Sequence, residues 1–382
     1  MPYWRLSAFY FFYFSALGVL APFWALYLKD SGYTAIQIGE LMAIPMATKM
    51  IAPFVWGVIA DHTNKRMQIV RSGALAAFLT FLLVFWVSGF WPLAIAMTLF
   101  SFFWNAVLPQ VEAVTFRHLD QESAMYSRVR VWGSIGFIAM VVGVGYLIDH
   151  HGSRVILYTL AVLYAGIWVA TQLVPEESTP AEHEHQHQPH SFFSLLKSPP
   201  ILTFVAACFL MQFSHGAYYT FYTIYMQGFG YSETLIGEMW ALGVIAEVVL
   251  YIFFMHKLLE RFGARTLLIA SLAIAGLRWL LIGHFGDSLA ILLFAQLLHA
   301  ATFGSFHAAA IHYVHHAFTH KLQGRGQALY SSISFGAGGA AGSVASGATW
   351  ELWGATTVFS IAAVIAFSGM LITIIGMDRR GG

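Results

Sequence analysis

Charged residues are scarce in this chain of 382 residues, and so is cysteine. Only 10% of the residues are Asp, Glu, Lys or Arg, against about 25% in soluble domains, and 58% are hydrophobic. The formal net charge of +1 provides no basic surface, so we expect no nucleic-acid partner. The single Cys208 cannot form a disulfide within the chain and leaves the redox compartment open. This composition excludes a soluble domain and predicts an integral membrane protein.

Twelve apolar segments are long enough to cross a bilayer as α-helices. Their approximate limits are 4–28, 36–60, 67–88, 92–116, 128–148, 153–174, 200–226, 234–257, 265–285, 288–313, 325–350 and 354–376. The first is too long for the apolar core of a signal peptide, and we find no small-residue cleavage site after it. We predict an all-α integral membrane fold of two six-helix bundles at 1–174 and 200–382, joined by a linker at 175–199.

The distribution of cationic residues predicts the orientation in the membrane. Of the 19 Lys and Arg residues, only Lys29 and Arg154 fall in odd-numbered loops, and Lys49, Arg130 and Arg278 fall within spans. The rest lie near the termini or in even-numbered loops. By the positive-inside rule, we expect both termini to be cytoplasmic.

The two halves are repeats of one another. The residues Gly32-Tyr33-Thr34 and Ile38-Gly39-Glu40 recur 198 positions later as Gly230-Tyr231-Ser232 and Ile236-Gly237-Glu238. The same offset places Lys49 opposite Glu247. A repeated six-helix unit is typical of transporters in which two bundles rock about a central site, although a repeat alone excludes neither a channel nor a membrane enzyme.

Polar residues inside the predicted spans of the first half are candidates for a binding surface. Asn105 and Glu112 are seven residues apart and share one helical face, with Pro109 between them. Arg130 opens the next span and can reach Glu112 across the short loop. Because charges inside a membrane are costly, we interpret these residues as a surface for substrate. The alternative is an ion pair that only ties two helices together.

In the second half, Glu247, Arg278 and His299 lie about eleven to thirteen residues into their spans, which is near the midplane at 1.5 Å per residue. A buried acid beside a movable cation can take up and release a proton, because burial favours the neutral acid and a cation favours the ionised one. We predict that Glu247 carries the proton and that Arg278 and His299 set its affinity. A fixed pair of Glu247 with Arg278 or Lys49 is the alternative.

Three tyrosines, Tyr218, Tyr219 and Tyr222, crowd one helix segment beside His215. We favour a cavity lining for them and place Tyr218 and Tyr219 in the predicted substrate site. The role of His215 stays open, because a neutral imidazole can simply be hydrogen-bonded between helices.

The linker contains a deceptive motif. The run from His183 to His187 matches H-E-x-x-H, which in metalloproteases lies on a helix with the two histidines on one face. Here it lies in a polar run flanked by Pro180 and Pro189. We therefore predict a flexible cytoplasmic linker that holds no catalytic metal site, and leave loose metal binding by its histidines open. Deletion of 182–190 should leave insertion and transport nearly intact.

The residues Gly57, Asp61, Lys65 and Arg66 follow the second span with the spacing G-x-x-x-D-x-x-x-[KR]-[KR]. This pattern resembles a cytoplasmic loop motif of the major facilitator superfamily. The resemblance implies that the acid caps a neighbouring helix and that the cations hold an inward gate.

The aromatic run at 9–14, the Asn105, Pro109 and Glu112 pattern, and Arg128-x-Arg130-x-x-Gly133 look like the lactose permease branch of that superfamily. The resemblance implies that Glu112 and Arg130 bind substrate, that Asn105 assists, and that the aromatic Phe137 stacks on it.

The second half is similar to the phenylpropionate permease family. The matching residues are His215-x-Ala217-Tyr218-Tyr219, the run 240–248, Arg278-Trp279, Gln296 to His299, and Thr302-Phe303. Lactose permeases have a carboxylate three residues after this histidine, where this chain has Thr302. Their proton-coupling chemistry therefore does not transfer intact.

The resemblance implies a secondary active transporter that is no enzyme and needs no cofactor. We expect proton-coupled symport of a small organic solute by alternating access, with an aromatic carboxylate such as phenylpropionate favoured because Arg130, Arg278 and Lys49 are cationic. The alternatives are a sugar or nucleoside symporter, or a membrane sensor that does not transport. We expect a monomer in the lipid bilayer of a bacterial inner membrane, whose partners are the substrate and protons.

Overall fold

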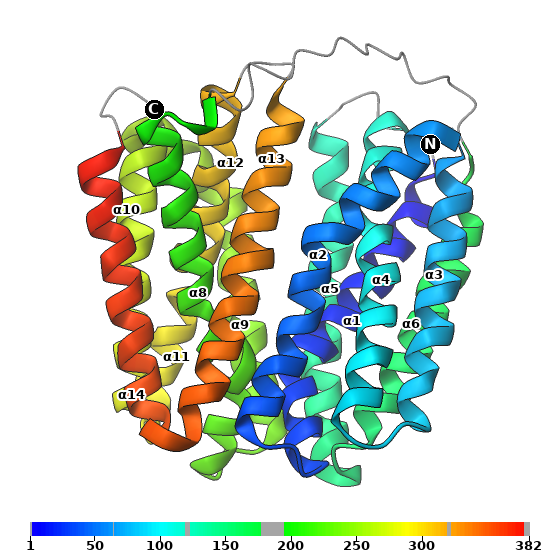
Figure 1. The fold of residues 1–382 in the computed structure, drawn as a ribbon, viewed down its shortest axis with the longest axis horizontal. Helices are drawn as coiled ribbons and strands as arrows, with labels where there is room; N and C mark the ends of the chain where they lie inside the picture. The colour runs from blue at the N-terminus through cyan, green and yellow to red at the C-terminus, as the bar shows by residue number, and fades with distance from the viewer. Residues whose placement is uncertain (1, 64, 119–122, 177–194, 319–321, 378–382) are drawn as a thin grey trace. The chain divides into compact units, whose positions relative to one another are not determined.

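The computed structural model describes residues 2–63, 65–118, 123–176, 195–318 and 322–377. Within these ranges the chain is helical nearly throughout and contains no strand (Figure 1). The helices of the first half are α1 (Tyr3–Asp30), α2 (Ala35–Thr63), α3 (Arg66–Leu82), η1 (Leu83–Phe85), α4 (Phe90–His118), α5 (Ser123–His151) and α6 (Val155–Leu173). Those of the second half are α8 (Pro199–Gly228), α9 (Glu233–Phe253), α10 (Met255–His284), α11 (Leu289–Leu297), η2 (Ala300–Ser305), α12 (Phe306–Ala317), α13 (Gln323–Ser331), η4 (Ser332–Gly338) and α14 (Gly339–Gly376).

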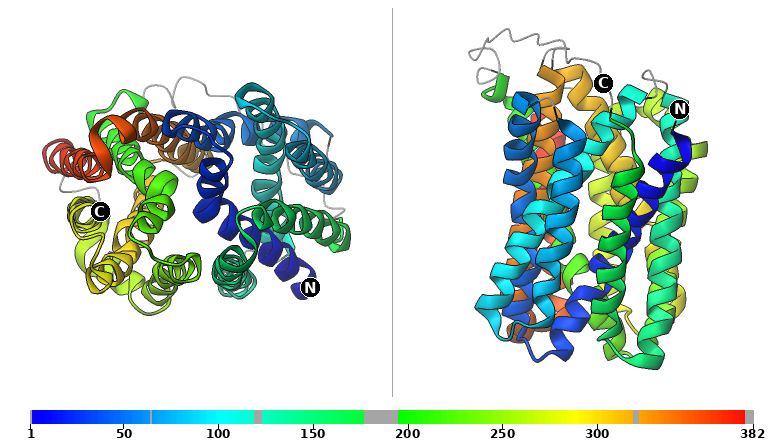
Figure 2. Two further views of the ribbon diagram at one scale, coloured as in Figure 1. Left: turned by 90° about the horizontal axis from the view of Figure 1, so that it is seen from below. Right: turned by 90° about the vertical axis from the view of Figure 1, so that its right-hand side faces the viewer.

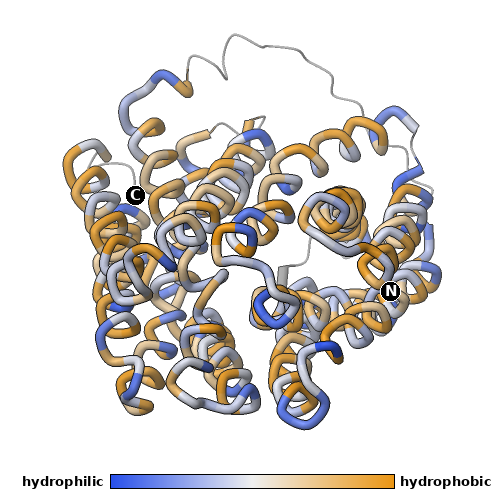
Figure 3. The backbone as a smooth tube through the Cα atoms, turned by 60° about the horizontal axis from the view of Figure 1, so that its bottom comes forward, coloured by the Kyte–Doolittle hydropathy of each residue, from blue (hydrophilic) through white to orange (hydrophobic). Residues whose placement is uncertain are grey.

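The helices form where the sequence is apolar over a bilayer's thickness. In lipid every backbone N–H and C=O must be bonded internally, and a long helix achieves this. Hydrophobic residues run along the helices, whereas hydrophilic residues gather at the helix ends and connections (Figure 3). The prediction of an all-α membrane fold is confirmed.

The structure assigns eleven helices of spanning length within the described residues. The last, 323–376, contains two of the predicted spans, because the chain turns at Gly354, where φ is 75°. A side chain strongly disfavours this left-handed backbone region, so glycine suits the turn. A similar turn at Gly263, where φ is 72°, separates the first residues of α10 from the spanning part. Predicted span 234–257 ends earlier than expected, at Phe253, because the backbone leaves the helical conformation at Phe254 before α10 begins.

The described residues group into two compact units. Unit 1 contains α1 to α6 together with Gly230–Ala241, which includes the first turns of α9. Unit 2 contains α8, the rest of α9, and α10 to α14. In unit 1, α1 packs against α5 and α6, and α4 packs against α2 and α3. In unit 2, α14 packs against α8 and α10. The left view of Figure 2 looks along the helices and shows those of each unit as a bundle.

The first turn of α9 is held by α5. Asp149 accepts hydrogen bonds from the backbone N–H groups of Glu233 at 2.9 Å and Thr234 at 3.0 Å, and also from the Thr234 hydroxyl. A carboxylate at a helix N-terminus satisfies free donors and complements the helix dipole. Glycines at Gly145 and Gly237 allow the close approach, because a side chain at either would overlap the facing backbone.

The repeat is visible in how two helices end. Arg71 of α3 donates to the carbonyl oxygens of Thr171 and Val174 at the end of α6. Arg265 of α10 donates to those of Ile374 and Met377 at the end of α14. In each half, a guanidinium from the third span therefore caps the sixth, where free carbonyls and a cation match.

Candidate functional site

Four polar side chains of unit 1 form what we name the N cluster: Lys49 of α2, Glu112 of α4, and Tyr126 and Arg130 of α5. The Tyr126 hydroxyl donates to Oε1 of Glu112 at 3.3 Å. Lys49 and Arg130 both interact electrostatically with Glu112. The structure thus brings Glu112 and Arg130 together, as the sequence predicts. Tyr126 was missed, although its place one helical turn before Arg130 puts it on the same face.

Aromatic rings position the Arg130 guanidinium. Its central carbon lies 3.7 Å from the centre of the Phe14 ring and 5.8 Å from that of Tyr10. Both rings come from α1, and the Tyr10 hydroxyl is itself bonded to Thr115 at 3.2 Å. A cation over a ring face is attracted to the negative π surface. The sequence run of aromatics on α1 therefore holds a cation as well as packing the core.

The N cluster is accessible and carries a net positive charge. Lys49 is exposed, and Glu112, Tyr126 and Arg130 are half-buried. Lys49 and Arg130 are cationic and Glu112 is the acid that both interact with, so the four residues together carry a net positive charge. Such a site can attract an anion while its aromatic walls contact an apolar group.

Asn105, which lies on α4 like Glu112, forms hydrogen bonds to a neighbouring helix. Its side chain is 5% exposed, and its amide nitrogen donates to the Pro45 carbonyl at 2.8 Å and to the Thr48 hydroxyl at 3.0 Å. Both partners lie on α2, so Asn105 ties α4 to α2. A substrate contact through its remaining oxygen stays a prediction.

Phe137 lies on α5, two helical turns after Arg130, and is half-buried. Its backbone lies directly against α1, since a side chain at Gly18 would overlap the Phe137 carbonyl. Stacking of the Phe137 ring on a substrate stays a prediction.

The second group lies in unit 2, and we name Glu247, Arg278, Gln296 and His299 the C cluster. Arg278 is fully buried. It donates to the Ala295 carbonyl at 2.9 Å, Gln296 Oε1 at 3.1 Å, His299 Nδ1 at 3.2 Å and Thr302 Oγ1 at 3.3 Å. All four of these acceptors are neutral. Because they occupy every nitrogen of the guanidinium, Arg278 has little capacity left for a substrate carboxylate.

The contacts of His299 identify its tautomer. Arginine can only donate, so Nδ1 of His299 must accept from Arg278 and its proton must sit on Nε2. Nε2 faces Oε2 of Glu247 at 3.8 Å. His299 therefore lies between Arg278 and Glu247. The predicted trio is brought together, in the order Arg278, His299, Glu247.

The tyrosines of α8 differ in their access. Tyr218 is buried, donates to Gln296 Oε1 at 2.9 Å, and lies under the Arg278 guanidinium with 4.3 Å between charge and ring centre. Tyr219 is half-buried and interacts electrostatically with Glu247. The ring of His215 stacks on Tyr219, and its Nδ1 faces the Met211 carbonyl of its own helix at 2.8 Å. Tyr218 thus supports Arg278, and Tyr219 is the better placed of the two for a substrate.

A π-helical segment, η2, begins directly after His299. Single π turns often mark functional sites in helices. Gly304 within it provides space for Glu247, because an added methyl group would come 3.0 Å from the Glu247 side chain. The sequence gives no sign of this segment, since its composition is that of an ordinary apolar helix.

The motif of Gly57, Asp61, Lys65 and Arg66 spans the last turns of α2 and the start of α3, and it contains an ion pair. Arg66 donates to Asp61 at 2.7 Å, and Asp61 is exposed. Lys65 is exposed as well, and Gly57 lies beside Gln110 of α4 with room for a methyl group. The gating role of these four residues stays a prediction.

The sequence profile of the MFS_1 like family matches residues 3–361. The chain belongs to this family and is a transporter of the major facilitator type. The probable 3-phenylpropionic acid transporter of Escherichia coli (strain K12) is 29% identical to it over 371 residues, 95% of each chain. The maltose permease of Geobacillus stearothermophilus is 27% identical over 377 residues, which cover 97% of this chain and 94% of that permease.

Among solved structures, a mutant of the nucleoside transporter NupG matches with a TM-score of 0.88 at 16% identity, covering 99% of this chain and 100% of that one. At this identity the likeness shows the fold alone. The family and these relatives are transporters, so the prediction that the chain is no enzyme is confirmed.

The H-E-x-x-H motif at 183–187 lies outside the described residues. In the part of the chain that is described, no group of three or more His, Cys, Asp or Glu residues could hold a metal ion.

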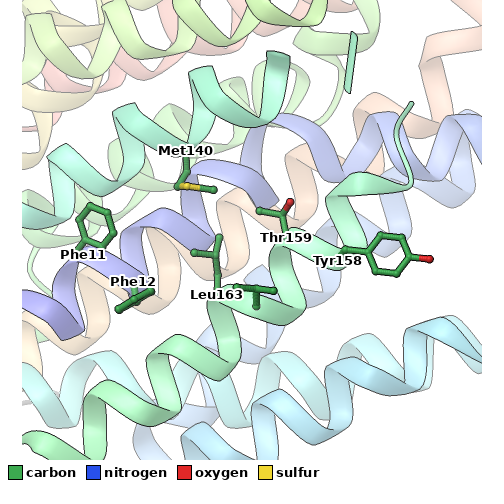
Figure 4. Close-up of a pocket in the computed structure, with 7 residues that line it drawn as sticks. Phe11, Phe12, Met140, Tyr158, Thr159 and Leu163 are labelled. Atoms are coloured by element: carbon green, nitrogen blue, oxygen red, sulfur yellow. The ribbon is translucent and has the colours of Figure 1, made fainter. Parts of the chain in front are cut away.

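A hollow of about 370 Å³ on unit 1 is lined by α1, α5 and α6 (Figure 4). Its walls are Phe11, Phe12, Met140, Tyr158, Thr159, Val162 and Leu163, which offer a polar solute almost no partner.

Proposed function

We propose that this major facilitator transporter is a proton symporter for a small aromatic carboxylate, working by alternating access across a bacterial inner membrane with both termini cytoplasmic. The observation that carries the substrate class is the N cluster, which is accessible, aromatic-walled and net positive. Lys49 and Arg130 would hold the carboxylate, and the rings near Arg130 would contact the apolar part. The name of the Escherichia coli relative, a probable 3-phenylpropionic acid transporter, supports the same class.

A sugar or nucleoside is the second candidate. Its support is Glu112, a half-buried acceptor suited to hydroxyl groups, and the names of a maltose permease and a nucleoside transporter among the similar proteins. The net positive charge of the N cluster favours the carboxylate, because an anion is attracted to it and a neutral ligand is not.

For the proton we propose Glu247. It is half-buried, with 21% of its side chain exposed, and its neighbour His299 presents an N–H toward it. Hydration would favour the ionised acid and burial the neutral one, so a change of access can release and reload the proton. Thr302, which occupies the place of a lactose-permease carboxylate, accepts a hydrogen bond from Arg278, and its hydroxyl cannot take up and release a proton as a carboxylate does.

The test is a substrate screen in proteoliposomes with a pH-sensitive dye inside. We expect an aromatic carboxylate to acidify the lumen as it enters, and to accumulate when an inward proton gradient is imposed. Uptake without dye response would overturn proton coupling, and binding without flux would indicate a sensor. The variant Glu247→Gln should still exchange substrate at equal concentrations but fail to accumulate it. If Glu247→Gln still concentrates substrate, the proton site lies elsewhere, with Glu112 or His215 next in line.

A further inference from the structure

A column of three parallel rings runs through η2 into α12. The imidazole of His299 stacks on Phe303 with centroids 5.4 Å apart and planes 7° apart. Phe303 stacks in turn on His307 at 6.3 Å and 9°. The rings follow one another at four-residue spacing, so they share a helical face. One imidazole of the column touches Glu247, and the other lies two turns further along the chain.

The outer imidazole has a phenol as partner. Nδ1 of His307 lies 2.9 Å from the Tyr330 hydroxyl, which belongs to α13 and is almost fully buried. The phenol can donate to the imidazole, or the imidazole to the phenol oxygen. A pair that can hold its shared proton in either direction is suited to pass one on.

Further titratable groups lead from this pair back to Glu247. Those that face Tyr330 are Cys208 and Tyr219 of α8 and Tyr251 of α9. Tyr219 also interacts with Glu247, and Tyr251 follows Glu247 by one turn and donates to the Gly304 carbonyl at 3.0 Å. The α12 helix packs against α10 and α13.

Beyond His307, α12 ends in imidazoles. His312 is half-buried, and His315 and His316 are exposed. The rings of His312 and His316 are 4.2 Å apart, and His315 contacts Gln327 at 3.2 Å. The helix therefore carries proton-accepting groups from its buried start to its exposed end.

We propose that His307 and Tyr330 form a second proton station between the C cluster and the exposed end of α12, and that Phe303 is a plug between the two imidazoles. This inference rests on the proposed proton coupling. The proton leaves Glu247, is taken up at the His307 and Tyr330 pair, and continues toward His312 and His315. The apolar ring of Phe303 prevents direct imidazole-to-imidazole transfer, so the passage depends on a change of conformation or hydration.

The test compares two assays on the same proteoliposomes. His307→Phe keeps the ring stack and removes both nitrogens, and Tyr330→Phe removes only the hydroxyl. Both should leave substrate exchange at equal concentrations unchanged and slow uptake driven by a proton gradient by tenfold or more, as loss of a proton-transfer group does. The double variant should be no slower than either single one. His150→Phe, at an exposed end of α5, is the matched control and should behave as wild type.

The plug has its own readout. Phe303→Ala should let the lumen acidify in the absence of substrate, whereas Phe303→Leu should not. If wild type couples protons and both His307→Phe and Tyr330→Phe keep the wild-type rate of driven uptake, the station is overturned. If one variant fails to fold, as judged by lost exchange, the other decides. If wild-type uptake moves no protons at all, the proposed function fails first and the station with it.

Discussion

The two polar clusters of this transporter hold similar charges in opposite ways. In the N cluster, Lys49 and Arg130 are within reach of solvent and face one acid, Glu112. In the C cluster, Arg278 is fully buried among four neutral acceptors, and its acid, Glu247, lies beyond His299. The first arrangement leaves charge available to a ligand. In the second arrangement, every nitrogen of the Arg278 guanidinium already donates a hydrogen bond within the protein.

This difference is the basis of the separate tasks that we propose for the two halves. A buried cation is costly unless its hydrogen-bonding capacity is satisfied, and Arg278 meets that condition with backbone and side-chain oxygens and an imidazole. In the mechanism that we propose, it acts as a fixed charge that biases the proton site at Glu247. An accessible cation loses less on exchanging water for a ligand, which is why we propose the N cluster as the substrate site.

The largest expected effect is on stability at Arg278. Arg278→Met would remove the donor to the Ala295 carbonyl and to His299 Nδ1, while Gln296 keeps its bond from Tyr218. It should cost about 3 kcal/mol of unfolding free energy, because a buried polar group left unsatisfied costs about 1–3 kcal/mol. Lys49→Met, the matched change at the accessible cation, should leave stability within about 0.5 kcal/mol. Thermal unfolding of both variants in detergent measures this. Equal destabilisation would erase the distinction between the clusters.

The second-largest expected effect is on substrate affinity at Arg130. Arg130→Lys keeps the charge but removes the planar fork and its packing over Phe14, and should weaken substrate binding by about 2 kcal/mol, roughly thirtyfold. Arg278→Lys should instead lower stability and the pH response. Equilibrium binding of the aromatic carboxylate to purified protein separates the two. Unchanged affinity in Arg130→Lys would mean that Arg130 and Glu112 only hold α5 and α4 together and do not bind substrate.

Glu112→Gln should change substrate affinity in opposite directions for the two candidate substrate classes. For a carboxylate, removal of a like charge should leave affinity unchanged or improve it by up to about tenfold, or 1.4 kcal/mol. For a sugar or nucleoside, loss of the charged acceptor should weaken binding by a similar factor. Titration with both ligand classes decides between them. A loss confined to the carboxylate would contradict our assignment of the N cluster.

The smallest effect concerns what the two halves share. Arg71→Gln and Arg265→Gln each remove a helix C-cap and should lower stability by about 1 kcal/mol. Because both guanidiniums bond two carbonyls at the end of the sixth helix of their half, the losses should match within error. Melting temperatures of the two variants test this, and a large inequality would show that the repeat is not energetically symmetric.

The sequence alone predicted the fold, the repeat and the identity of the polar residues, because the length of an apolar run and the expense of a charge within it are local properties. It also paired Glu112 with Arg130 and grouped Glu247, Arg278 and His299. It missed Tyr126 and the π turn after His299.

Only the tertiary structure showed that Arg278 donates hydrogen bonds to Ala295 and Gln296, and that the amide group of Asn105 is bonded to α2. It also showed that His299 lies between Arg278 and Glu247. Helical spacing places a residue on a face, whereas the partner of that face depends on which helix packs there and at what depth. Hydrogen-bond capacity is used up by those neighbours, and they come from distant parts of the chain.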